Sequence, residues 1–366
     1  MALEKERDAL LASAPPPPPV ALAVGDAQPA DLPVHQRGNH LQLGPRPVPR
    51  GFLQVVSRVH APPPIPKDRS GRLELAQWLV SPGHPLVARV VVNRIWQAHF
   101  SEGLVRTPDN FGLRGERPTH PELLDWLAHR FVQSGWDVKA LHRLILSSAV
   151  YQQSTMPAPA EPGSPGPEVV DPENRLLHRF PRRRLDAEMI RDAILQVSGR
   201  LDTTLGGSLV DWKNNEYVPG DEVSATSVRR TVYLPIVRDR TYDALLLFDF
   251  ANPSVTTARR VPTVVPQQAL FFLNSPLVQT SAVAVARSLP LGDDKAGPIP
   301  EQAIDAAYRR ILGRTPSAPE RERCRSFIRD YASHPGATPG EEGTASDAWA
   351  AFCQALMASN EFVYRP

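Results

Sequence analysis

The stretch Arg72–Gln153 reads RLELAQWLVSPGHPLVARVVVNRIWQAHFSEGLVRTPDNFGLRGERPTHPELLDWLAHRFVQSGWDVKALHRLILSSAVYQQ. Its apolar residues recur at helical spacing, and Pro or Gly separates one periodic segment from the next. We predict a helix that begins near Ser70 and ends at Ser81–Pro82–Gly83, and a second helix over Leu86–Phe100. The second helix is apolar on most of its circumference, which is typical of a buried central helix.

The same stretch continues into a predicted helical hairpin. Thr119 and Glu122 have the spacing of a capping box, and Pro121 is tolerated in the first turn because the N–H groups there are free. Gly135 suits a left-handed stop, and Asp137 suits the N-cap of the next helix. The two apolar stripes consist of Leu123, Leu124, Leu127, Phe131 and Val132, and of Val138, Leu141, Leu144 and Ile145.

Two further segments carry a resemblance to a known family. They read RFPRRRLDAEMIRDA from Arg179 and FDFANPSVTTARRVPTVVPQQALFFLN from Phe248. With the arm that ends in VPRGF at Phe52, they make residues 20–366 resemble the planctomycete-specific family called domain of unknown function 1553. The resemblance implies the C-terminal part of a large exported protein that carries cytochrome c-type domains.

The predicted fold class is mainly α, a multi-helix domain with a small N-terminal β or irregular arm and one short internal strand pair. Residues 1–19 are interpreted as a charged helix end and a Pro spacer, and residues 20–66 as the arm and a Pro-rich linker. Residues 67–366 are predicted to form a single helical domain with flexible loops near 156–170 and 334–345. The internal strand is placed at Arg229–Arg238, at a sheet edge because of Pro235.

Composition excludes several classes of protein. The chain has 366 residues, 40 of them Pro, and a net charge of +2, which gives no argument for a nucleic-acid partner. Two cysteines, Cys324 and Cys353, are too few for a disulfide framework. Both fall on apolar stripes and are interpreted as core residues, with a disulfide between them left open if the protein is exported.

Targeting signals are missing from the sequence as it stands. The N-terminus MALEKERDALLAS is charged where a signal peptide is apolar, and no apolar run reaches the length of a membrane span. By itself the chain is therefore expected to be cytoplasmic. The resemblance implies instead an exported, periplasmic or cell-surface protein, of which this chain is a fragment or a separately encoded module.

The densest charge cluster lies at Arg179–Asp192. Its arginines could grip sulfate, phosphate or carboxylate groups through bidentate hydrogen bonds. Alternatively the helix pairs its own charges, since Arg184 and Glu188 lie one turn apart. A second arginine pair lies in a loop just before a predicted helix and would complete a basic cleft. The predicted ligand-binding residues are Arg182, Arg183, Arg184, Arg259 and Arg260.

Catalytic signals are weak. His120, Glu122 and Asp125 lie within one and a half helical turns and are the candidates for acid–base catalysis, although the capping box accounts for Glu122 without it. The sequence has no GxSxG, Walker loop, dinucleotide fingerprint, HExxH or CxxCH. We therefore predict neither a cofactor nor a metal site.

Two polar residues, Asn93 and Arg94, interrupt the apolar second helix. A buried Arg needs a carboxylate partner, so Arg94 is predicted to bond Asp125, Asp186 or Asp249. Such contacts would form either a polar network that specifies the packing or the floor of a pocket. The predicted network consists of Asn93, Arg94, Asp186, Glu188 and Asp249.

Two functions are consistent with these features. The first is a non-catalytic helical module for assembly or ligand binding within an exported planctomycete complex, whose partners are other domains or proteins and an anionic glycan. The second is a hydrolase that acts on sulfated or uronic polysaccharide. Arginines paired across packed helices would favour the module, and a pocket with a desolvated carboxylate would favour the enzyme.

Overall fold

The structure is a computed structural model. It describes residues 2–13, 23–160, 162–207, 209, 225–238, 240–291, 299–332 and 344–365. The chain divides into two compact units, Met1–Arg89 and Val90–Pro366. The predicted Pro spacer and most of the predicted loop at 334–345 lie outside the described residues.

The first unit contains the predicted arm. Strands β1 (Leu32–His35) and β2 (Leu43–Val48) pair antiparallel around a short 3-10 turn, with Leu32 opposite Val48. This confirms the small N-terminal β element. The helices of the unit are α1 (Ala2–Ser13), α2 (Gln54–Ser57) and α3 (Arg72–Leu79), and α4 begins within it.

Helix α3 is buried through Trp78 rather than along a leucine stripe. Leu73 and Leu75 are exposed, whereas Trp78 contacts the rings of His60 and His84. His84 Nδ1 accepts the backbone N–H groups of Leu86 and Val87 at 3.3 Å each. This imidazole therefore caps the next helix, α4 (Val87–Phe100).

The second unit holds the predicted hairpin. Helices α5 (Pro121–Gln133) and α6 (Val138–Leu146) share one apolar core with α4. Gly135 has a φ of 70°, and Asp137 Oδ1 accepts the N–H of Ala140 at 2.9 Å, so the predicted stop and N-cap are confirmed. The core consists of Val92, Trp96, Phe100, Leu104, Val105, Leu124, Leu127, Phe131, Leu141, Ile145 and Phe180.

The predicted capping box at Thr119 is wrong. The N-cap of α5 is His120, and no side chain caps the helix. Both the backbone N–H and the hydroxyl of Thr119 donate to the carbonyl of Leu104, at 2.9 and 3.4 Å. The Thr119 side chain therefore holds the preceding loop and is not available to the helix.

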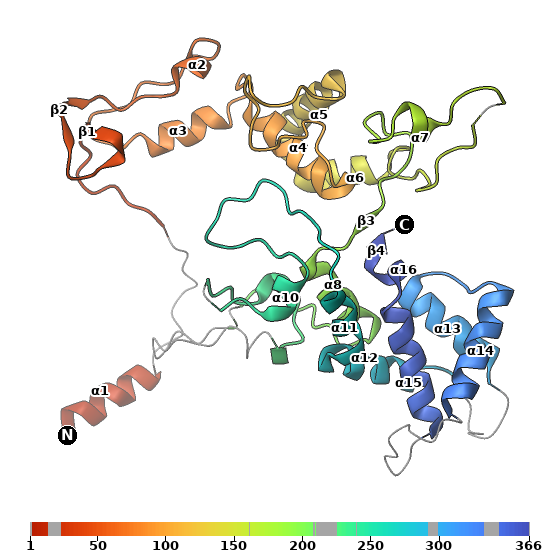
Figure 1. The fold of residues 1–366 in the computed structure, drawn as a ribbon. Helices are drawn as coiled ribbons and strands as arrows, with labels where there is room; N and C mark the ends of the chain where they lie inside the picture. The colour runs from red at the N-terminus through yellow and green to blue at the C-terminus, as the bar shows by residue number, and fades with distance from the viewer. Residues whose placement is uncertain are drawn as a thin grey trace. The chain divides into compact units, whose positions relative to one another are not determined.

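A second apolar core is built from the helices between Ala187 and Val363. Figure 1 shows α12 (Pro276–Arg287) and α15 (Thr344–Met357) lying side by side, and they pack against one another. The α-helices after α6 in the described ranges are α7 (Pro167–Val170), α8 (Ala187–Val197), α10 (Asp243–Leu247), α11 (Pro266–Asn274), α12 (Pro276–Arg287), α13 (Glu301–Leu312), α14 (Ala318–Ala332), α15 (Thr344–Met357) and α16 (Asn360–Val363). Cys324 and Cys353 are both free and buried in this core, as predicted for core residues, and form no disulfide.

The internal strand pair exists, but at a different place from the one predicted. Strand β3 (Arg183–Arg184) pairs antiparallel with β4 (Tyr364–Arg365) near the C-terminus (Figure 1). The predicted strand at Arg229–Arg238 is wrong, because Thr231–Tyr233 forms a 3-10 turn. Val232 is 71% exposed and Leu234 only 5%, so the alternating residues there do not share a buried face.

No single helix in the described part of the chain is long and apolar enough to cross a membrane. Helices α11 and α12, which are bent relative to one another, together have the length and apolar composition of a membrane span, and nothing beyond length and composition supports such a span. In α12, the apolar residues Val278, Ala282 and Val285 are buried in the second core.

Candidate functional site

Six arginines line one cavity of about 670 Å³ in the second unit. Its walls come from one face of α4, from β3, from the end of α10 and from the loop that precedes α11. Tyr364 of β4 also contributes. We call it the arginine cavity, and its arginines are Arg94, Arg182, Arg183, Arg184, Arg259 and Arg260.

Arg184 and Asp249 form the buried part of the wall. Their side chains are 5% and 19% exposed, and Arg184 Nη2 lies 2.5 Å from Asp249 Oδ2. Arg184 also donates to the carbonyls of Phe248 and Thr263. Because the guanidinium bonds both the end of α10 and the loop before α11, it fixes β3 against these two segments.

Asp249 adopts an unusual backbone conformation, with a φ of 61°. Its carboxylate accepts the N–H and the hydroxyl of Thr263 at 2.9 and 2.8 Å, in addition to Arg184. Burial raises the pKa of this carboxyl, but the bonds from Thr263 and Arg184 outweigh burial and hold the pKa below its ordinary value. Asp249 is therefore an ionised structural partner of Arg184.

Arg260 is held by Glu188 of α8. Two hydrogen bonds of 2.6 and 2.8 Å join the guanidinium to both carboxylate oxygens, and the guanidinium lies 5.0 Å from the ring centre of Phe250. Burial opposes ionisation of Glu188, yet its bonds to Arg260 lower its pKa overall. The predicted pairing of Glu188 with Arg184 within the helix does not occur.

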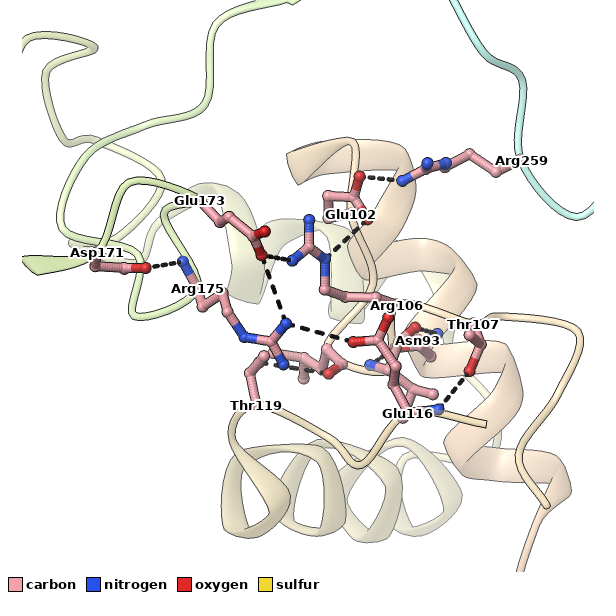
Figure 2. Close-up of polar contacts among 12 residues, drawn as sticks. Asn93, Glu102, Arg106, Thr107, Glu116, Thr119, Asp171, Glu173, Arg175 and Arg259 are labelled. Carbon is pink, nitrogen blue, oxygen red and sulfur yellow. Dashed lines mark hydrogen bonds and ion pairs between the residues drawn. The ribbon is translucent and has the colours of Figure 1, made fainter. Parts of the chain in front are cut away.

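Arg183 and Arg259 each form an ion pair with a carboxylate. Arg183 bonds Asp186 at 2.8 Å and donates to the carbonyl of Ala98, and Arg259 pairs with Glu102 at the end of α4. Glu102 belongs to a larger network shown in Figure 2. Four of the five predicted arginines therefore have carboxylate partners.

The network beyond Glu102 was not predicted from the sequence. Arg106 lies 3.4 Å from Glu102 and 2.6 Å from Glu173, and Arg175 lies 3.6 Å from Glu173 and 3.4 Å from Glu116 (Figure 2). Two of these four pairs, Arg106 with Glu173 and Arg175 with Glu116, join residues far apart in the sequence, so no local spacing signals them. The alternating charges lock the loop after α4 to the segment that precedes β3.

Arg94 and Arg182 are the two arginines of the cavity without a carboxylate partner among the described residues. Arg94 is exposed on α4, so the prediction of a buried Arg94 bonded to an acid is wrong. Arg94, Gln97 and Ser101 follow one another at helical spacing and line the same wall. The Ser101 hydroxyl is buried and has no hydrogen-bond partner in the described part of the chain.

The predicted polar network is divided among separate contacts. Asn93 is fully buried, and its side-chain amide exchanges two hydrogen bonds with the backbone of Val105, at 2.8 and 2.9 Å. It has no bond to an acid of the cavity. Asp186, Glu188 and Asp249 each bond a different arginine.

The candidate acid–base residues lie elsewhere. His120 bonds the neighbouring Thr119 hydroxyl at 3.0 Å, while Glu122 and Asp125 are exposed on α5. None of the three lines the arginine cavity. Within the described ranges, no group of three or more His, Cys, Asp or Glu residues is arranged to hold a metal ion.

Charge is the distinguishing property of the cavity. Its lining contains six arginines but only three carboxylates, those of Glu102, Asp186 and Asp249. Glu188 lies outside this lining but pairs with Arg260, so the six arginines have four carboxylates near them. The cavity therefore has a surplus of two positive charges. Guanidinium groups bind carboxylate, sulfate and phosphate through paired hydrogen bonds, so the cavity has the chemistry of an oxyanion site.

A protein-family profile described as "Protein of unknown function (DUF1553)" matches residues 71–328. This range contains the hairpin, β3, α8 and every arginine of the cavity. Neither the curated proteins nor the solved structures include a significant match to the chain.

Proposed function

This chain belongs to the family of proteins of unknown function called DUF1553, and we propose that it acts as a non-catalytic helical module that binds an anionic ligand in the arginine cavity. The observation that carries the proposal is the positive surplus of the cavity. Arg94 and Arg182 have no competing carboxylate among the described residues, so they can bond a ligand without breaking an ion pair. The paired arginines hold the walls in place.

The ligand class that we propose is a sulfated or uronic glycan. The cavity, at about 670 Å³, falls within the size range of small-molecule sites and is large enough for more than an inorganic ion. A lining that carries six guanidinium groups suits an anion better than an uncharged ligand. We further propose that the module works within an exported planctomycete protein that also carries cytochrome c-type domains.

Binding is favoured over hydrolysis by the charge state of two partly buried carboxylates, those of Asp249 and Glu188. A glycosidase needs a carboxylic acid that keeps its proton near neutral pH, which requires a raised pKa. Hydrogen bonds lower the pKa of both Asp249 and Glu188 instead. Both side chains act as partners of arginines, an arrangement that supports a binding module.

The proposal is tested by calorimetric titration of sulfated and uronic-acid oligosaccharides into wild type and the Arg94→Ala, Arg182→Ala double variant. A charged hydrogen bond contributes about 1.5–3 kcal/mol, so we expect the double variant to lose at least about tenfold in affinity. The wild-type affinity should fall as salt rises, because the attraction is electrostatic.

Arg287→Ala is the matched control, since it removes an exposed arginine of α12 that does not line the cavity. It should bind like wild type, and thermal unfolding should show all three proteins folded. Equal affinities of wild type and the double variant, or no binding of any anionic oligosaccharide, would remove the proposal.

A further inference from the structure

A second cavity adjoins the arginine cavity. It measures about 730 Å³, and its lining shares Asp186 and Arg260 with that of the arginine cavity. We call it the α8 cavity, because Met189, Asp192 and Gln196 line it from one face of α8. Its volume also falls within the range of small-molecule sites. Two sites of this size that share part of their walls can hold neighbouring units of one ligand.

The three carboxylates that line the α8 cavity are all neutralised by arginines. The pairs are Asp186 with Arg183 at 2.8 Å, Glu188 with Arg260 at 2.6 Å and Asp192 with Arg191 at 3.7 Å. An anionic group that enters this cavity therefore meets no acid without a cation beside it.

Arg230 is the arginine of this lining that has no carboxylate partner among the described residues. Its side chain is exposed, and it directly precedes the 3-10 turn that begins at Thr231. Asp192 Oδ1 accepts the N–H and the hydroxyl of Thr231 at 2.8 and 2.6 Å, so this turn is fastened to α8. Arg230 therefore stands beside the α8 cavity on a fixed backbone and gives it a surplus of one positive charge.

The positive surplus thus extends through both cavities. Arg94 and Arg182 have no carboxylate partner in the described part of the chain, and the same holds for Arg230 in the adjoining cavity. A ligand with a single anionic group can bond only one of these two regions. A ligand with anionic groups on several units can bond both, and the second group then binds at a high effective concentration.

From this juxtaposition we infer that one glycan with an anionic group on each unit occupies both cavities, with one charged unit at Arg94 and Arg182 and another at Arg230. This inference rests on the proposed function and specifies its ligand class. The ligand is a repeating polyanion rather than a glycan with one acidic end, and Arg230 is a binding residue for its second charge.

The test measures binding of oligogalacturonic acids of one to four units by calorimetry at low salt. The fully methyl-esterified tetramer has the same units without charge and is the control probe. If wild type binds sulfated but not uronic sugars, galactose oligosaccharides of one to four units sulfated on every unit replace the acids, and unsulfated galactotetraose replaces the ester. A hydrogen bond to a charged group is strong enough for a gain of at least about tenfold from the monomer to the tetramer. The uncharged tetramer should not bind.

Arg230→Ala separates the two cavities. It should lower the affinity for the charged tetramer by at least about tenfold and leave the affinity for the charged monomer unchanged. The affinity of this variant for the tetramer should also fall less steeply with salt than that of wild type, because one ionic contact is lost.

Arg238→Ala is the matched control, since it removes another exposed arginine from the same segment that lines neither cavity. It should bind like wild type at every ligand length, and thermal unfolding should show both variants folded. Equal affinity of wild type for the monomer and the tetramer, or an undiminished gain with length in Arg230→Ala, would overturn the two-cavity inference and leave the proposed function standing. Failure of every charged probe to bind wild type would remove both.

Discussion

Arg184 shows how one side chain can hold a site together. Its guanidinium bonds Asp249, Phe248 and Thr263, and it lies 5.7 Å from the ring centre of Phe248. Its Nε is buried without a hydrogen-bond partner in the described part of the chain. A buried charge with this many contacts is strongly destabilised when its partner is removed, so Arg184 is a structural residue that also faces the cavity.

Replacing Arg184 by Ala should therefore lower the free energy of unfolding by roughly 3–5 kcal/mol, because the guanidinium's buried contacts are lost and the partly buried Asp249 keeps its charge without that cation. Arg182→Ala removes an exposed side chain without a carboxylate partner among the described residues, and should change stability by no more than about 0.5 kcal/mol. Urea unfolding of both variants measures the difference. Similar stabilities of the two would contradict the division between structural and ligand-facing arginines.

Asp249 predicts a pH dependence of stability. Its pKa is lower in the folded protein than in the unfolded chain, where Asp titrates near about 3.9. The contribution of the Asp249 carboxylate to the free energy of unfolding is therefore fully present above the unfolded pKa, and it is lost as pH falls through the lower pKa of the folded protein. Asp249→Asn should be less stable than wild type at pH 7, and the gap should narrow below about pH 4. Urea unfolding midpoints of wild type and Asp249→Asn between pH 7 and 3 measure this difference in stability. A difference that stays the same at every pH would contradict the prediction.

At the scale of elements, the α5–α6 hairpin depends on two different kinds of N-terminus. Helix α6 begins with an Asp137 side chain that accepts a backbone N–H, whereas α5 begins at His120 without a side-chain cap. Pro121 has no N–H to satisfy in the first turn of α5. The core contacts of Leu124, Leu127 and Phe131 hold that helix instead.

This contrast predicts unequal costs for two substitutions. Asp137→Ala removes a cap and should destabilise the protein by about 1 kcal/mol. Thr119→Ala removes a long 3.4 Å bond to Leu104 and a 3.0 Å bond to the neighbouring His120 ring, neither of which caps the helix, and should cost clearly less. Thermal unfolding of the two variants at matched concentration decides the order. The reverse order would restore Thr119 as the cap of α5.

At the scale of the whole molecule, residues 90–366 contain two apolar cores. Helix α4 belongs to one of them, while β3 and the loop before α11 lead into the other. Contacts of Arg183 with Ala98 and of Arg259 with Glu102 join these elements across the arginine cavity. The site is therefore formed jointly by elements of both cores.

We predict that the second unit, residues 90–366, behaves as one domain. Limited proteolysis should cut before residue 70, within 156–170 or within 334–345, and the fragments cut at 156–170 should stay together in size-exclusion chromatography. The physical reason is that the arginine contacts and Phe180 join the two sides of that loop. Recovery of two separately folded fragments would show independent domains.

Local periodicity determined the two helices of the hairpin. There, the interval between apolar residues matches the helical turn, so neighbouring residues already carry the information needed to place each helix. Asp137 and Gly135 could be assigned for the same reason, because their roles depend on the nearest backbone groups. The family resemblance rested on contiguous motifs as well.

Only the tertiary structure decided which charges meet. Arg260 bonds Glu188, 72 positions away, and Arg259 bonds Glu102, 157 positions away, so no spacing rule predicts either pair. Tertiary contacts also overruled local patterns, since Thr119 bonds Leu104 and the alternation at Val232 and Leu234 belongs to a 3-10 turn. Residue types and short-range spacing specify helices, whereas ion pairs, cavities and their surplus charge depend on distances that exist only after the helices have packed.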